Sequence, residues 1–270
     1  VDTGFIVLND KTYPNLHKFL EELGVGVRDS NMSFGYHCEQ TGMQYAGVSW
    51  NALFAQRKNI FSPKFLKMLL EIKRFSVQAI KDLEEDNLSG LSLEEYLRKH
   101  SFSETFITHY LVPMGGAIWS SSNEGIFEFP AETYARFFKN HGLLDLSERP
   151  QWQTVVGGSH SYVKAFLEVF KGEVHKGSAV EKVLRDENGV ELVLENGAKH
   201  KFDLVVIASH ADESLAILDQ PTADEKRLLD AWSYHKNHTV LHCDQSVLPP
   251  KKLAWASWNY KREKENISNK

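Results

Sequence analysis

Hydrophobic and polar positions between residues 151 and 211 predict a helix, a β-meander and a buried strand, in that order. The pair Gly157-Gly158 precedes an amphipathic run that ends near residue 170. Two Asn-Gly pairs, at 188–189 and 196–197, are flanked by alternating apolar residues, a pattern typical of tight hairpin turns. Residues 204–208 are an unbroken apolar run. Such a run favours a strand buried on both faces of a parallel sheet.

Apolar stripes and capping residues predict helices in the rest of the chain. A stripe of leucine and phenylalanine after Pro14 stops at Gly24, as expected at a helix end. Ser62 before Pro63 predicts a helix start, and Ser92 with Glu95 predicts a capping box. We expect further helices over residues 104–111, ending before Pro113, and over residues 130–138 and 221–232.

Alternating residues predict several short strands. Residues 32–36 and 43–45 alternate on either side of a Gln-Thr-Gly turn, which predicts a hairpin. Residues 2–8, 239–243 and 254–258 are also expected to be strands. Together with the helices and the buried strand, these segments predict an α/β fold.

Composition limits the classes of partner. The chain has 270 residues, of which 42% are hydrophobic and 25% charged, enough for a sizeable core in one or two domains. A formal net charge of -5 argues against a nucleic-acid partner. No apolar run approaches the ~20 residues that span a bilayer, so we expect no transmembrane segment. Cys38 and Cys243 favour free thiols and a cytoplasmic location, with one long-range disulfide as the alternative.

Two kinds of chemistry find no support in the sequence. A metal site could use His235, His238, His242 and Cys243. On an extended strand, however, His238 and His242 would be about 13 Å apart, whereas zinc ligands lie within ~2.3 Å of one ion. We therefore expect no metal. The residues after Gly158 lack the second glycine of a G-x-S-x-G motif, so a serine hydrolase is not supported.

Six short pieces, in order along nearly the whole chain, resemble the superfamily of flavin-containing amine oxidases and protoporphyrinogen oxidases, which includes phytoene desaturase-like enzymes. Within it, the chain is most similar to bacterial predicted NAD/FAD-binding oxidoreductases. The pieces are Val1-Asp2-Thr3-Gly4-Phe5 with Tyr13-Pro14 and residues 20–24; residues 113–120, which include Met114 and Trp119; residues 140–144; Val156-Gly157-Gly158-Ser159 with Tyr162-Val163; residues 203–208; and residues 255–260. Singly each is weak, but jointly they are specific.

The resemblance implies two domains. Residues 1–30 and 152–218 would form part of an FAD-binding domain, Rossmann-like and of the glutathione-reductase type. Residues 31–151 and 219–270 would form a substrate domain with a mixed sheet and a helical insertion. No GxGxxG follows a strand in this sequence. In the family, that motif lies upstream of Asp2 and another flavin-contacting segment lies further downstream. We therefore expect an internal fragment that retains FAD weakly or not at all.

The resemblance also implies site residues. Asp2, Gly4 and Phe5 would pass beside the flavin ring, where a glycine lets backbone approach a planar ligand. Gly157 and Gly158 would start a helix, Val180 would bind the adenine edge, and Ala208 and Ser209 would leave room for the dinucleotide. Met114, Trp119 and His238 would line the substrate cavity. For each position, an ordinary turn, strand or core role remains the alternative, and no catalytic residue is assigned.

The implied function is an FAD-dependent oxidoreductase that transfers a hydride from a small organic, apolar substrate to flavin. The alternative is a non-catalytic flavoprotein-like binding or scaffold module. Flavin amine oxidases often carry a lysine that holds a water against the flavin ring. The corresponding positions here are Asn237 and His238, preceded by Lys236. This difference leaves amine oxidation, desaturation and isomerisation all open.

Overall fold

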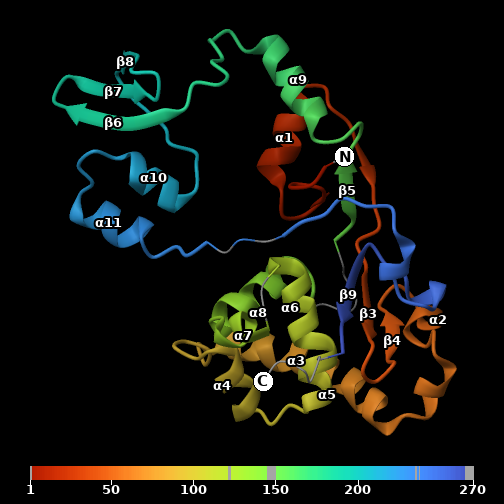
Figure 1. The fold of residues 1–270 in the computed structure, drawn as a ribbon. Helices are drawn as coiled ribbons and strands as arrows, with labels where there is room; N and C mark the ends of the chain where they lie inside the picture. Colours follow the sequence, from red (N-terminus) through yellow and green to blue (C-terminus); the bar gives the residue numbers. More distant parts are fainter. Residues whose placement is uncertain (1, 121–122, 145–149, 235, 237, 265–270) are drawn as a thin grey trace. The chain divides into compact units, whose positions relative to one another are not determined.

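The computed structural model describes residues 2–120, 123–144, 150–234, 236 and 238–264 (Figure 1). They form two compact units, one made of Val1–Val169 with His242–Lys270 and the other of Phe170–Leu241. This division differs from the domain boundaries expected from sequence, which stay a prediction.

Helices form the largest part of the first unit. Between residues 50 and 140 they are α2 (Trp50–Leu53), η1 (Arg57–Phe61), α3 (Pro63–Glu84), α4 (Leu93–Lys99), α5 (Glu104–Phe106), η2 (Ile107–Leu111), α6 (Val112–Trp119), α7 (Asn123–Glu128) and α8 (Ala131–Asn140). The predicted starts of α3 and α4 are confirmed. The Ser62 side chain accepts the Phe65 N–H, and Ser92 forms a capping box with Glu95.

The prediction that a helix ends before Pro113 is wrong. The chain passes from α5 through one π-helical turn, η2, directly into α6. Pro113 has no N–H to donate to the carbonyl of His109, four residues earlier. The Tyr45 hydroxyl donates to that carbonyl instead, at 2.6 Å. A donor from another element thus replaces the one that proline lacks, and the helical path continues.

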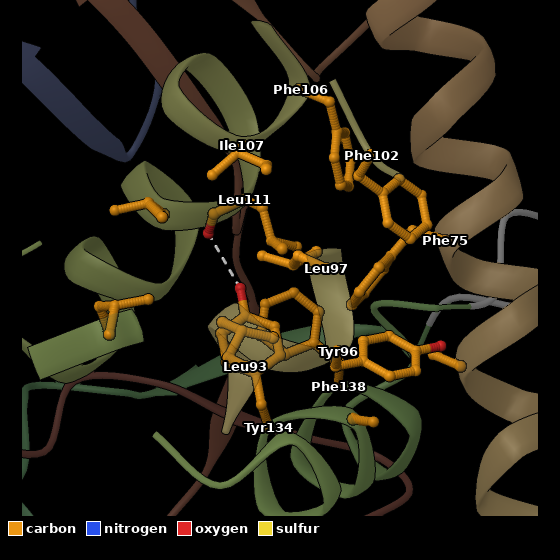
Figure 2. Packing of buried hydrophobic residues seen from close by; sticks show 14 of the residues in the cluster. Phe75, Leu93, Tyr96, Leu97, Phe102, Phe106, Ile107, Leu111, Tyr134 and Phe138 are labelled. Carbon is orange, nitrogen blue, oxygen red and sulfur yellow. Dashed lines mark hydrogen bonds between the residues drawn. The ribbon is translucent and has the colours of Figure 1, made fainter. Parts of the chain in front are cut away.

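Aromatic side chains fill the core beneath these helices (Figure 2). The Phe75 ring lies 5.7 Å from both Phe102 and Phe106 and 6.4 Å from Tyr134, measured between centroids. The Tyr134 hydroxyl donates to the Leu111 carbonyl at 2.9 Å, the dashed line in Figure 2. The core therefore also donates a hydrogen bond to the last residue of the π-helical turn.

A mixed sheet in the order β4-β3-β9 packs against the helices. Strand β3 (Phe34–Cys38) pairs antiparallel with β4 (Gln44–Ala46), which confirms the predicted hairpin, and parallel with β9 (Trp258–Arg262). The predicted strand over residues 254–258 starts only at Trp258. A Cβ on Gly35 would lie 2.6 Å from the Ala254 carbonyl oxygen, so the chain after η4 (Lys252–Ala254) packs over β3 before it can pair beside it.

A small sheet, β1-β5-β2, has a core of its own made of Leu8, Leu20 and Val155. Its elements are β1 (Leu8–Asn9), β2 (Val27–Asp29) and β5 (Trp152–Val155), with α1 (Pro14–Glu22) and α9 (His160–Val169). The predicted helices α1 and α9 are confirmed. The strand predicted over residues 2–8 is wrong for most of its length, because its first residues bind Ser159 rather than a neighbouring strand.

The second unit contains the predicted meander. Strands β6 (Val180–Asp186), β7 (Gly189–Leu194) and β8 (Lys199–Phe202) pair antiparallel in sequence order, followed by α10 (Ala211–Ile217) and α11 (Ala223–Leu229). A hairpin forms at each predicted Asn-Gly pair. The second turn is confirmed, with φ of +81° at Gly197. The first turn is shifted by one residue to Glu187 and Asn188, and Gly189 opens β7 opposite Asp186. Helix α11 is shorter than the predicted 221–232.

The predicted buried strand over residues 204–208 is wrong for this chain. These residues form no strand, and the side chains of Leu204 and Val206 are 87% and 90% exposed. A strand buried on both faces needs parallel neighbours and covering layers. The named strands of this unit pair antiparallel, and the parallel bridge from Val183 in the described residues goes to Leu218, outside residues 204–208. Residues 239–243 also form no strand, and Leu241 is 75% exposed. Both cysteines are free, so the alternative disulfide is not formed.

We predict that Tyr45→Phe lowers the free energy of unfolding by about 1–3 kcal/mol, because it leaves the His109 carbonyl without its donor in the core. Tyr134→Phe should cost about 1 kcal/mol, because it removes one buried hydrogen bond, the one to the Leu111 carbonyl. Urea denaturation followed by circular dichroism measures both. Tyr234→Phe is the control: Tyr234 is 46% exposed and water can replace its hydroxyl, so the change should stay within about 0.5 kcal/mol. Equal effects of all three substitutions would contradict the stabilising role given to the Tyr45 and Tyr134 hydroxyls.

Candidate cofactor and substrate sites

The carboxylate of Asp2 lies at the start of α9. Both of its oxygens are 3.0 Å from the backbone nitrogen of Ser159, whose N–H they accept. The Ser159 hydroxyl in turn donates to the Phe5 carbonyl at 2.9 Å. A negative charge at a helix N-terminus is favourable because the first N–H groups have no partner within the helix. These contacts hold residues 2–5 against the turn that opens α9.

The predicted glycine pair builds the space that Asp2 occupies. Gly157 and Gly158 have φ of +80° and +85°, in the left-handed region that glycine adopts most readily. A Cβ on Gly158 would lie 3.1 Å from an Asp2 carboxylate oxygen, and one on Gly157 would lie 2.7 Å from the Ser161 hydroxyl. The structure therefore brings the first and fourth sequence pieces together. The pair accommodates the Asp2 carboxylate at the start of the helix.

Gly4 differs from these two glycines. Its φ lies outside the left-handed region, and a Cβ built on it would meet nothing within 4 Å. The neighbouring Phe5 is 36% exposed, and its ring packs edge-on against Tyr13, 6.2 Å away. No described part of the protein requires glycine at position 4, so Gly4 presents bare backbone at the surface.

The other predicted cofactor residues lie in the second unit. Val180 is the first residue of β6 and pairs with Leu194, next to a register shift in the ladder. Ala208 is exposed in the connection to α10. The hydroxyls of Ser209 and Ser214 are 2.9 Å apart. Their roles toward a dinucleotide stay predictions.

Met114 and Trp119 lie on the helix α6, so the turn that was the alternative to a cavity role for these residues does not form. The Trp119 ring is 4.7 Å from Phe129 and 4.9 Å from Phe137, within the aromatic core. A Cβ on Gly115 would approach Tyr134 and Ile126 to 3.1 Å, so glycine here allows close helix packing. Met114 packs against the same core. These contacts give both predicted residues a packing role, and the cavity role stays a prediction.

His238 is exposed in the second unit. Asn237, which was compared with the family's lysine position, and His235, a candidate metal ligand, lie outside the described residues. Among the described residues, no group of three or more His, Cys, Asp or Glu could hold a metal ion. Nor is any described helix long and apolar enough to cross a bilayer.

A hollow in the first unit has a volume of about 610 Å³. It is lined by His242, Cys243, Asp244, Gln245, Val247, Leu248, Asn259, Lys261 and Glu263. A hollow of about 510 Å³ in the second unit is lined by Asn188, Lys201, Phe202, Asp203 and Leu204. Neither contains a residue predicted for the substrate cavity.

The sequence did not predict a polar cluster formed by Tyr36 and His109. The Tyr36 hydroxyl and the His109 Nδ1 atom are hydrogen-bonded at 2.7 Å, and the Tyr260 ring stacks on Tyr36. Burial lowers the pKa of His109, with a smaller effect from Arg262, and burial raises the pKa of Tyr36. The sequence predicted the hairpin in which Tyr36 and Tyr45 are paired. Nothing in the sequence connects these two tyrosines to His109.

The comparison with known families identifies the class of protein. The family model described as flavin containing amine oxidoreductase matches residues 1–252, so the chain belongs to this family. Membership implies that the cofactor is FAD. No curated protein matches the chain.

Solved structures show the same fold at low identity. A redesigned putrescine oxidase has a TM-score of 0.60 at 15% identity, with 84% of this chain and 51% of that chain covered. Cyclohexylamine oxidase from Brevibacterium oxydans IH-35A has a TM-score of 0.60 at 15% identity, covering 85% and 52%. A fatty acid isomerase from P. acnes that produces CLA has 0.56 at 12%, covering 85% and 52%. The chain thus spans about half the length of these structures.

We predict that stability falls when the pH drops from about 7.5 to about 5.5. Because burial holds the pKa of His109 below its ordinary value of 6.5, the unfolded chain binds the proton more readily. The contribution of neutral His109 to the free energy of unfolding is therefore fully present above pH 6.5 and is lost as the pH falls below that value. The pKa of His37 is also lowered, so it adds to the same trend.

Melting temperatures across this pH range test the assignment to His109. His109→Asn should flatten the pH dependence, leaving the part that comes from His37, because asparagine keeps a polar atom for Tyr36 and does not titrate. His175→Asn changes an exposed histidine and is the control. An identical pH dependence in His109→Asn and the unmodified chain would show that His109 does not contribute.

Proposed function

We propose that the protein containing this chain is an FAD-dependent oxidoreductase that transfers a hydride from a small organic, apolar substrate to flavin. Family membership supports the cofactor. The observation that carries the proposal is Gly4, which presents bare backbone although nothing in the described structure requires glycine there. A planar ligand that approaches the backbone closely would supply the missing reason.

The residues around Gly4 fit this role. The Asp2 carboxylate, held by the Ser159 N–H, fixes the position of residues 2–5. Hydrogen bonding of Ser159 to the Phe5 carbonyl keeps the backbone of this segment in one orientation. Bound FAD would supply the hydride acceptor, and these residues would hold its ring and limit the access of water.

The residues of the second unit would bind the dinucleotide. Val180 lies beside a register shift in β6, which leaves its backbone irregularly paired and supports contact with the adenine edge. Ala208 and Ser209 are small and exposed, which is compatible with a ligand passing close to them.

We also propose that residues 1–30 and 152–218 belong to a Rossmann-like FAD-binding domain whose other strands come from outside this chain. The exposed apolar side chains of Leu204 and Val206 support this. The chain alone would then retain FAD weakly. Residues 31–151 and 219–270 would form the substrate domain. Two free cysteines support the proposed cytoplasmic location.

The substrate class rests on the aromatic character of α6 and its neighbours, with Met114 and Trp119 proposed for the cavity wall and His238 as a further contact. The names of similar structures include two amine oxidases and one fatty acid isomerase. Amine oxidation, desaturation and isomerisation of an apolar substrate are therefore all candidates.

A non-catalytic flavoprotein-like module is the second candidate. It is favoured by Trp119, whose ring is packed among Phe129, Phe137 and Tyr134. Anaerobic addition of candidate amines and unsaturated fatty acids to the flavin-loaded protein separates the two. Loss of the visible flavin absorbance indicates net hydride transfer, as in oxidation or desaturation. A shifted double bond in the recovered fatty acid indicates isomerisation, which leaves the flavin oxidised. Neither change with any candidate favours the binding module.

We predict that Gly4→Val lowers the affinity for FAD at least ~10-fold, because a branched side chain would keep the ligand away from the backbone. FAD titration of the longest form of the protein that contains this chain measures the affinity. Thermal stability without FAD should be unchanged, since the new side chain meets open space.

Gly47→Val is the matched control for this substitution. Gly47 is also exposed, its φ lies outside the left-handed region, and a Cβ there makes only an ordinary contact at 3.9 Å. Its FAD affinity should equal that of the unmodified protein. If Gly4→Val and Gly47→Val bind FAD equally well, the flavin does not approach Gly4 and the proposed site is wrong.

A further inference from the structure

Large apolar side chains are exposed on α3 and on α2 and η1, the two short helices that precede it. We call them the α3 face: Trp50, Phe61, Leu66, Leu70 and Val77, which are 78%, 86%, 39%, 71% and 62% exposed. Leu66, Leu70 and Val77 follow the spacing i, i+4, i+11 and share one side of the helix. Exposed apolar side chains that share one side of a packed helix are typical of a surface that binds a partner.

The α3 face is supported by the core beneath it. On the opposite side of the same helix, Phe65, Met68 and Phe75 are buried. The Trp50 ring stacks on Phe54 at 6.5 Å, and Phe54 contacts the edge of Phe65 at 5.8 Å. The exposed residues therefore lie on a packed, capped helix and its adjoining turns.

The charge around the α3 face is positive, although the chain as a whole carries -5. Between residues 40 and 81 the sequence has one acidic residue, Glu71. Its side chain is buried and accepts hydrogen bonds from the backbone N–H and hydroxyl of Ser103 and from Arg74. The exposed cations in this stretch include Arg57, Lys58, Lys64, Lys67 and Lys73. The face thus combines apolar groups with unneutralised positive charge.

We propose that the α3 face binds the surface of an anionic lipid bilayer, with α3 lying in the headgroup region. An interfacial helix needs an apolar side that enters the acyl boundary and lysines or arginines that meet acidic headgroups, and aromatic residues favour this boundary. The cations explain the choice of a lipid surface, because a purely apolar protein partner would not need them. Binding at the surface requires no helix that crosses the bilayer. The proposal does not depend on the proposed flavin chemistry.

Sedimentation of the 270-residue chain with phosphatidylcholine vesicles, with and without about a third phosphatidylglycerol, tests this proposal. We expect binding to the anionic vesicles that weakens with added salt, and little binding to the neutral ones. The triple variant Trp50→Ser/Phe61→Ser/Leu70→Ser and the charge variant Lys64→Glu/Lys67→Glu should each lower the vesicle partition at least ~10-fold.

Exposed apolar residues elsewhere provide the matched control. Leu204→Ser/Val206→Ser replaces two apolar side chains of the second unit that are more exposed than any residue of the α3 face. This variant should leave vesicle binding unchanged. Circular dichroism checks that each variant is folded. In addition, the blue shift of tryptophan fluorescence on anionic vesicles should diminish in Trp50→Phe. Equal binding of the face variants and the unmodified chain, or loss of binding only in the Leu204 variant, would overturn the proposal, as would no binding at all.

Discussion

The first unit depends on how three buried tyrosines satisfy one irregular stretch of helix. Tyr45 and Tyr134 donate their hydroxyls to the carbonyls of His109 and Leu111, and Tyr36 bonds the His109 ring. Because Pro113 has no N–H, the His109 carbonyl lacks the donor that an α-helix would supply from position 113. Because Tyr36 and Tyr45 belong to the mixed sheet and Tyr134 to α8, the same hydrogen bonds join the sheet, η2 and the helical core.

This arrangement positions α6 and, through it, the residues proposed for substrate recognition. Trp119 packs among aromatic rings because α6 continues past Pro113 and carries Gly115 close against Tyr134. A separate constraint organises the proposed flavin site. There, the left-handed glycine pair makes room for the Asp2 carboxylate, which holds the bare backbone at Gly4. Both regions lie within residues 1–252, which the family model matches.

Features that depend on local chemistry could be predicted from the sequence. The caps at Ser62 and Ser92, the Asn196-Gly197 turn and the hairpin over residues 32–45 need only residues close in the chain, and all are confirmed. Features that depend on distant partners could not. Pro113 predicted a helix end. The prediction failed because the hydroxyl that replaces the missing donor belongs to Tyr45, 64 residues from His109 in the sequence. Residues 204–208 predicted a buried strand, but the described residues do not provide the neighbouring strands it needs. In the candidate site, the motifs pointed to Asp2 and the glycine pair, but the Asp2–Ser159 hydrogen bonds and the His109 cluster require the fold.

The central claim is that the Tyr45 hydroxyl replaces the backbone donor missing at Pro113. A double-mutant cycle in urea denaturation tests it most directly, using Tyr45→Phe, Pro113→Ala and the double variant. Alanine restores an N–H that can reach the His109 carbonyl, so the cost of Tyr45→Phe should largely disappear in the Pro113→Ala background, a coupling of about 1 kcal/mol or more. Strictly additive effects of the two substitutions would contradict the account.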